Sequence, residues 1–145
     1  MFSKTAFFIL FCILPLALRS AEPTLNVQES SDTRKAMQMS MDIGFGLMMR
    51  CMEATSQEMK SQGKSDDEIG TLLMDPAQKA KMKETCPCRF KKESLEALKE
   101  LDGIIKKHPD WRGKTIMVKQ KNGTGKEKIS IKGLEEIKNK VSKCS

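Results

Sequence analysis

The stretch 84–91 reads Glu-Thr-Cys-Pro-Cys-Arg-Phe-Lys, and its Cys86-Pro87-Cys88 centre decides how the rest of the chain is held together. Two further cysteines, Cys51 and Cys144, lie on either side of it in the sequence. Four cysteines behind an export signal predict two structural disulfide bonds. A Cys86–Cys88 bond would close a very small, strained ring. We therefore expect Cys51 to bond with one member of the pair and Cys144 with the other, which would tie the first and last helices to one central bend.

The export signal is predicted over residues 1–20. Lys4 supplies a positive charge, Thr5–Leu18 is apolar apart from Pro15, and Arg19 ends the run. This run is too short to cross a bilayer, which takes about 20 apolar residues. We interpret it as a cleaved signal peptide, which predicts a secreted or periplasmic protein.

The full sequence has 145 residues, and the part predicted to remain after cleavage has more basic than acidic residues. Without Lys4 and Arg19, the 26 Lys and Arg residues fall to 24 against 19 Asp and Glu, a net charge of +5. Such a surplus suits an anionic partner, and a solvated Lys-rich surface is the plain alternative. The chain has no Tyr and one Trp, so it lacks the aromatic platforms on which nucleic acid bases stack. We do not expect a nucleic acid partner.

The N-terminal half is predicted to be helical. Residues 21–31 are polar and aperiodic and predict a flexible arm, ahead of a single disulfide-linked domain over 32–145. A first helix should begin at Ser31 or Asp32 and end near Ser61 or Gln62. Its apolar residues recur at helical spacing: Met37, Met41, Phe45, Met48, Met52 and Met59, with Met39, Ile43 and Leu47 widening the stripe.

Capping signals place the following helices. Ser65 and Glu68 match a capping box, and Asp75-Pro76 supplies a cap and a proline at the first helical position. We expect a bend at Pro87 and one helix from Phe90 to Lys107.

The C-terminal third predicts a β-hairpin and a last helix. Thr115–Lys119 and the alternating Ile129 and Ile131 flank Asn122-Gly123, a tight-turn pair. Leu134, Ile137 and Val141 then mark an amphipathic helix that ends at Cys144. The predicted fold class is mainly α (α+β), with four to five helices, a C-terminal β-hairpin and two disulfide bonds.

Two chemical hypotheses compete with a purely structural role for sulfur. Cys86 and Cys88 lie near basic residues that lower thiol pKa values, so they could form a redox pair, although exported proteins use cysteine mainly for structural bonds. Methionines crowd around Cys51 and would suit Cu(I), but helical spacing explains them as core residues. A third hypothesis is a Met-lined groove that accepts a small apolar ligand.

No catalytic constellation is recognisable. His108 is the single histidine, and we find no nucleophile in a triad-like setting. We predict no metal site and no cofactor. Trp111 is interpreted as an anchor for the hairpin. Asn122-Gly123-Thr124 matches a glycosylation acceptor, although Asn-Gly is also what a tight turn needs.

The order of Cys51, a polar helical stretch and Cys86-Pro87-Cys88 before a Leu-rich helix resembles small exported helical proteins of Gram-negative bacteria with a Cys…Cys-x-Cys pattern. The resemblance covers roughly residues 46–101. It implies an envelope or secreted location and no particular activity, because these proteins are largely uncharacterised.

The sequence therefore favours an exported protein that acts by binding rather than catalysis. The expected partner is an anionic surface, such as phospholipid headgroups or a glycan, or else a protein. The candidate binding residues are Lys91, Lys92, Lys106, Lys107, Lys119, Lys121, Lys126 and Lys128. Thiol-disulfide exchange at Cys86 and Cys88 and the apolar groove are the alternatives.

Overall fold

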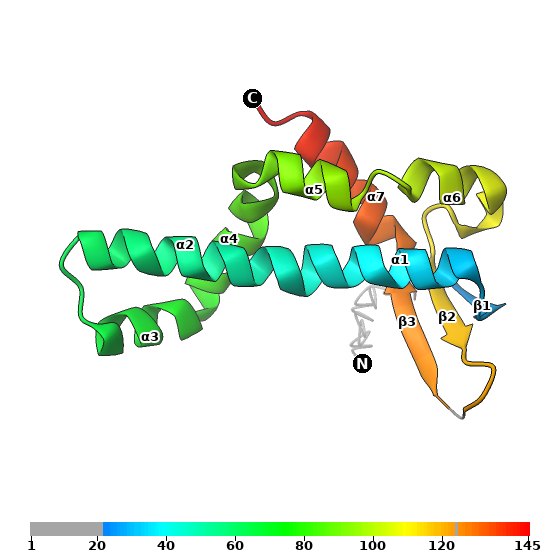
Figure 1. Cartoon of the computed structure of the whole chain (residues 1–145), viewed down its shortest axis with the longest axis horizontal. Helices are drawn as coiled ribbons and strands as arrows, with labels where there is room; N and C mark the ends of the chain where they lie inside the picture. The colour runs from blue at the N-terminus through cyan, green and yellow to red at the C-terminus, as the bar shows by residue number, and fades with distance from the viewer. Residues whose placement is uncertain (1–21, 124) are drawn as a thin grey trace, which may run out of the picture.

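A single helical rod runs along the molecule. The computed structural model describes residues 22–123 and 125–145, so the predicted signal peptide lies outside the described residues. Helix α1 (Ser31–Met41), the π-helical turn η1 (Asp42–Gly46) and helix α2 (Leu47–Ser61) follow one another without a break (Figure 1). The Ser30 hydroxyl accepts a hydrogen bond from the Thr33 amide and caps the rod. The predicted first helix is confirmed.

The buried face of this rod differs from the predicted one. Residues at every fourth position, Ile43, Leu47 and Cys51, face the interior. Met41 and Phe45, expected on the apolar stripe, are 56% and 70% exposed. The rod carries apolar side chains on most of its sides, so more than one side could be buried. Residues two positions apart on a helix point in nearly opposite directions. The core therefore selects Ile43, which leaves Met41 and Phe45 outside.

Helices α3 (Asp66–Met74) and α4 (Pro76–Arg89) fold back along the rod, and both begin at the predicted caps. The expected bend at Pro87 is wrong, because α4 continues through the proline. Pro87 removes only its own amide donor, and the Phe90 amide still bonds to the Cys86 carbonyl at 3.0 Å. The chain changes direction at Phe90.

The helix expected from Phe90 to Lys107 is divided into α5 (Lys91–Ala97) and α6 (Leu101–Lys107). The Leu101 amide bonds to the Leu98 carbonyl, three residues back, which tightens the chain between the two helices. Both leucines are thereby completely buried.

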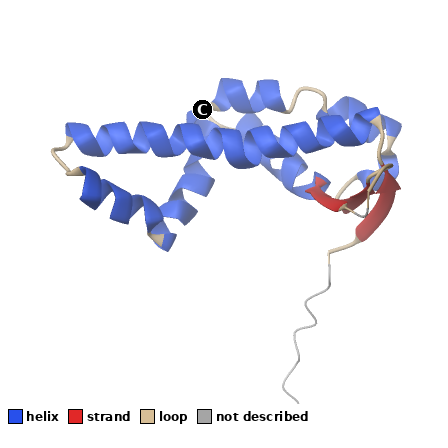
Figure 2. Cartoon of the chain, turned by 60° about the horizontal axis from the view of Figure 1, so that its bottom comes forward, coloured by secondary structure: helices blue, strands red, loops and turns tan. Residues whose placement is uncertain are grey.

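A three-stranded sheet occupies one end of the molecule (Figure 2). Strands β2 (Thr115–Lys119) and β3 (Lys126–Ser130) pair antiparallel as the predicted hairpin, after the 3₁₀ turn η2 (Pro109–Trp111). Helix α7 (Ile131–Ser142) follows directly, so Ile131 opens the helix.

The flexible arm predicted over 21–31 is wrong for β1 (Thr24–Gln28), which pairs parallel with β2. Leu25 and Val27 alternate with polar residues and turn toward the core, so this short segment gains both a hydrogen-bond ladder and apolar contacts.

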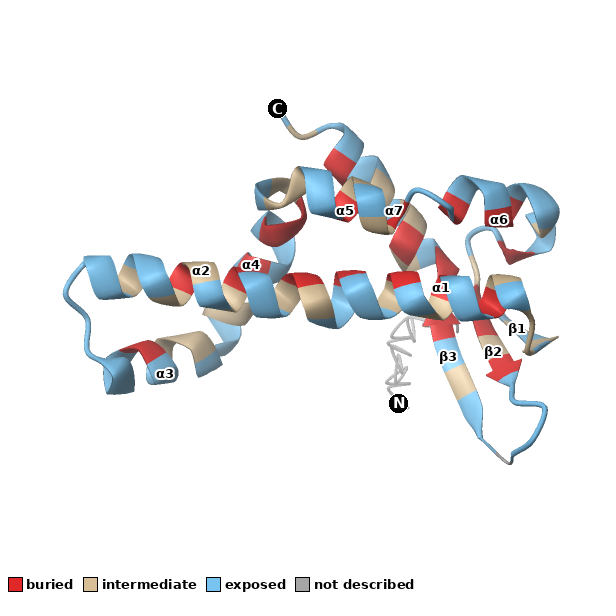
Figure 3. Ribbon diagram, in the orientation of Figure 1, coloured by how far each residue is buried: buried red, intermediate tan, exposed pale blue. Residues whose placement is uncertain are grey.

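The buried residues, red in Figure 3, belong to two core clusters, of which one is much larger. The larger cluster joins α1 to α6, α7 and the sheet, and it contains the fully buried Leu98 and Ile116. The smaller one contains Cys51, Met82 and Cys86 and lies between α2 and α4. The fold class predicted from the sequence, mainly helical with a C-terminal hairpin and two disulfides, is confirmed. Within the described ranges, no helix has both the length and the apolar character that crossing a bilayer requires.

Candidate functional site

Two disulfide bonds meet on α4. Cys86 bonds to Cys51 on α2, and Cys88 bonds to Cys144 just beyond α7. The expectation that Cys51 and Cys144 each bond to one member of the pair is confirmed. Because α4 is helical through Pro87, residues 86 and 88 lie about 200° apart around its axis. One sulfur therefore faces the rod and the other faces the end of α7.

This arrangement leaves no vicinal thiol pair at the Cys-Pro-Cys sequence. Cys86 is 1% exposed, and each sulfur is held by a partner on another element. The neighbouring cations are also engaged elsewhere, since Arg89 pairs with Glu58 and the Lys91 ammonium donates to the Cys144 carbonyl. A free Cys86/Cys88 dithiol would require reduction of both the Cys51–Cys86 and the Cys88–Cys144 bond.

Two of the methionines near Cys51, Met48 and Met52, pack with Met82 against the smaller cluster, and the others lie elsewhere. Met39 lies in the main core, whereas Met49 is 51% exposed, and the Cys51 sulfur is taken up by its disulfide. Across the part of the chain that the structure describes, no group of three or more His, Cys, Asp or Glu residues is placed to hold a metal ion.

The hairpin gathers positive charge on one exposed face. Lys119 lies directly opposite Lys126, and Lys128 lies opposite Met117. Strand residues two apart share a face, so Lys126 and Lys128 point the same way, and Glu127 points to the other side. These lysines make no ion pair with any carboxylate in residues 22–123 or 125–145. Lys121 adds a fourth exposed lysine near the hairpin tip; we call Lys119, Lys121, Lys126 and Lys128 the basic hairpin.

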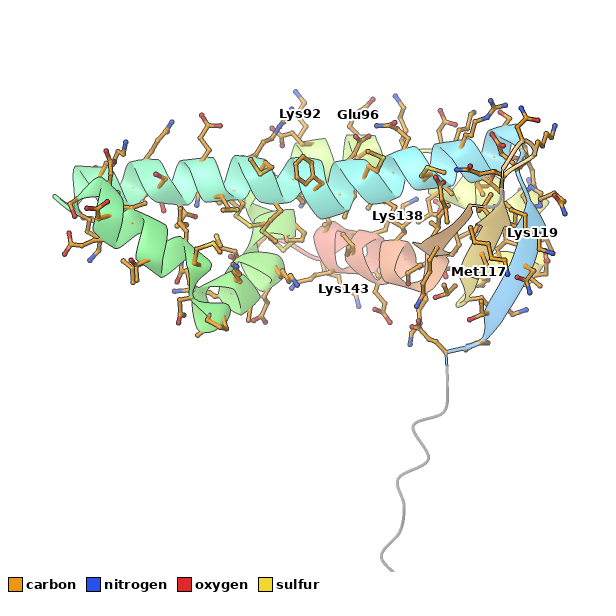
Figure 4. The ribbon with its side chains drawn as sticks, turned by 90° about the horizontal axis from the view of Figure 1, so that it is seen from below. Lys92, Glu96, Met117, Lys119, Lys138 and Lys143 are labelled. Carbon is orange, nitrogen blue, oxygen red and sulfur yellow. A yellow bond between two sulfur atoms is a disulfide. The ribbon has the colours of Figure 1, made fainter. Side chains whose placement is uncertain are left out.

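The other four predicted lysines are not part of this face. Lys92 lies on α5, toward the middle of the molecule, whereas Met117 and Lys119 lie at the sheet end (Figure 4). Lys91 is half-buried beside Cys144, and Lys106 and Lys107 lie at the end of α6. The structure therefore brings together half of the predicted binding residues.

His108 belongs to a structural contact. Its Nε2 lies 3.0 Å from Asp32 Oδ2, and its ring stacks on Trp111 with centroids 4.1 Å apart. The hydrogen bond with His108, helped by the Lys107 ammonium, holds the pKa of Asp32 below its ordinary value. Trp111 is 4% exposed and packs in the main core, so its predicted role as an anchor fits its position.

A charged groove runs between the rod and α5. Two adjoining cavities of about 360 and 320 Å³ share Asp42, Glu96 and Ala97 as lining residues. The Lys35–Glu100 ion pair lies along it, and its hydrogen bond lowers the pKa of Glu100 and raises that of Lys35. Charges of both signs in the groove thus neutralise one another.

A different cavity, of about 260 Å³, opens on the other side of η1. Its lining is apolar and comes from the rod, α4 and α7, with Lys83 as its one charged residue among those described. Of the methionines in the hypothesised Met-lined groove, Met48 lines this cavity, whereas the contributions of α4 and α7 were not expected. The nearest signal was Gly44-Phe45-Gly46, two glycines inside a predicted helix.

Comparisons of this chain with models of protein families, with curated proteins and with solved structures find no match.

Proposed function

We propose that this protein is an exported binding protein that attaches to anionic lipid headgroups through the basic hairpin. The observation that carries the proposal is the row of lysines on the exposed face of the sheet. Lys119 and Lys126 are direct cross-strand neighbours. Like charges in that position destabilise a sheet, so a negatively charged partner would relieve a repulsion that the free protein retains.

The setting of the hairpin supports this role. The larger core cluster includes Ile116 and Ile129, so the hairpin is fixed to the helices by its inner face and presents the lysines outward. Two disulfide bonds suit the oxidising compartments in which exported proteins meet lipid and glycan surfaces.

Lysines on a sheet edge have another known role. β3 is an edge strand, and edge lysines discourage pairing with a second sheet. That role predicts aggregation when the lysines are removed, with no change in binding to vesicles.

The test is co-sedimentation of the mature chain with vesicles that contain phosphatidylglycerol and phosphatidylcholine, or phosphatidylcholine alone. Each lysine near an anionic surface contributes about a fivefold factor in partitioning, so K119Q/K126Q/K128Q should reduce binding on the order of 100-fold. The control, K64Q/K81Q/K92Q, removes three exposed lysines elsewhere and leaves the same net charge.

Wild-type binding should also decline as salt rises, because the Debye length falls from about 10 Å at 0.1 M to about 3 Å at 1 M. Equal losses in the two triple variants would show that total charge, and not the hairpin, governs binding. Absence of binding to the phosphatidylglycerol vesicles at low salt would refute the proposal.

A further inference from the structure

The cavity beside η1 has rigid walls. Ile43 and Leu47 come from the rod, Cys86 and Pro87 from α4, and Ile137 from α7. The Cys51–Cys86 bond fastens the rod to α4, and the Cys88–Cys144 bond fastens α4 to the end of α7. Protein interiors normally close around empty apolar space. Here the same two cross-links join the three elements that line the cavity, which favours a preformed site.

The π-helical turn leaves room at its glycine. Gly44 lines the cavity, and a Cβ placed on it would meet no atom within 4 Å. Turns of this kind inside helices are frequent at functional sites. A side chain at position 44 would therefore occupy open space at the cavity lining.

Lys83 gives the cavity its polarity. It lies on α4, one turn before Cys86, is exposed, and makes no ion pair within residues 22–123 or 125–145. An ammonium group at the edge of an apolar cavity complements a ligand with an anionic head and an aliphatic tail.

We propose that this cavity binds a medium-chain fatty carboxylate, with the carboxylate beside Lys83 and the chain between the rod and α7. The volume of about 260 Å³ sets the chain length. A methylene is similar in size to a water molecule, which occupies about 30 Å³ in the liquid, so the cavity holds about eight or nine carbons beyond the carboxylate. The site is separate from the basic hairpin and does not depend on the proposed lipid-surface function.

The experiment is isothermal titration of the mature, disulfide-bonded protein with hexanoate, octanoate and decanoate below their micellar concentrations. Affinity should rise about fourfold for each buried methylene. Decanol, with the same chain and no charge, serves as the comparison ligand.

Two variants locate the site. G44L places a side chain in the open space and should weaken decanoate binding at least tenfold. Its matched control is G70L on α3, where the added Cβ also meets no atom within 4 Å and which contributes no residue to the cavity lining. K83M keeps most of the aliphatic stem and should weaken decanoate about tenfold while leaving decanol unchanged.

The outcomes separate this site from the hairpin. Decanoate binding that is lost in G44L and kept in G70L and in K119Q/K126Q/K128Q supports the proposal. No decanoate binding, equal loss in G44L and G70L, or equal effects of K83M on decanoate and decanol would overturn it. Loss of decanoate binding in K119Q/K126Q/K128Q would also overturn it, because the cations that bind the carboxylate would then lie on the hairpin and not beside the cavity.

Discussion

Removing the Cys51–Cys86 bond should open one part of the molecule and leave the rest folded. The change is C51A/C86A, which keeps the second disulfide. The smaller core cluster has three buried members, and the two cysteines are among them. On α3, Ile69 is the one buried residue that the structure describes. This part of the fold therefore has little apolar burial to hold it once the cross-link is gone.

The magnitude follows from the loop that the bond closes. The cysteines are 35 residues apart, and a loop of that length corresponds to about 4 kcal/mol in the chain-entropy model. A tenfold change in an equilibrium constant takes about 1.4 kcal/mol, so local opening should become on the order of 500-fold more frequent.

Native-state hydrogen exchange measures this opening residue by residue. Amides of Ile69 and Met82 should exchange on the order of 500-fold faster in the variant. Amides of Leu98 and Ile116, in the larger cluster, should keep their protection. The matched variant C88A/C144A retains the bond between α2 and α4 and should leave Ile69 unchanged. A uniform loss of protection across both clusters would refute the reasoning, and so would unchanged exchange at Ile69.

Two further predictions concern stability. Because Asp32 has a lowered pKa in the folded protein, its ionised form stabilises the fold above its unfolded pKa of about 3.9, and this stabilisation is lost as pH falls through the folded pKa. D32N lacks this titration and should therefore lose less stability in acid, measured as urea midpoints from pH 6 down to pH 3. A steeper acid loss in D32N would contradict this. L98A should lower the free energy of unfolding by about 3 kcal/mol because Leu98 is fully buried. F45S should change it by less than about 0.5 kcal/mol because Phe45 is 70% exposed. Urea titration measures both values, and a larger loss in F45S than in L98A would contradict the description of the core.

Local signals in the sequence were sufficient for most of the elements. The capping box at Ser65 and Glu68 and the Asp75-Pro76 start each depend on neighbours within a few residues, and both lie where they were expected. Asn122-Gly123 does lie between the hairpin strands, but the connection from Lys119 to Lys126 is longer than the expected tight turn. Strand β1 has no such signal. Its partner, β2, lies about 90 residues further along the chain, and a parallel pairing needs no turn between the two strands.

The candidate sites show the same limit. Alternation along β3 puts Lys126 and Lys128 on one face, but the antiparallel register with Lys119 was needed to place all three together. The cavity was not predictable, because Gly44, Lys83 and Ile137 come from three elements that meet only in the folded chain. Which cysteine of the pair faces Cys51 likewise depends on the continuation of α4 through Pro87, where the sequence suggested a bend.

The pairing of the cysteines has a consequence for biogenesis. Along the described chain, the first cysteine bonds to the second and the third to the fourth, so the two closed loops follow one another and neither encloses the other. A polypeptide that enters an oxidising compartment with its N-terminus first would present Cys51 and then Cys86 before the C-terminal partner of Cys88 arrives. The Cys51–Cys86 bond can therefore form before the C-terminal part of the chain has entered the compartment. The order of translocation thus matches the order in which the two native bonds can form.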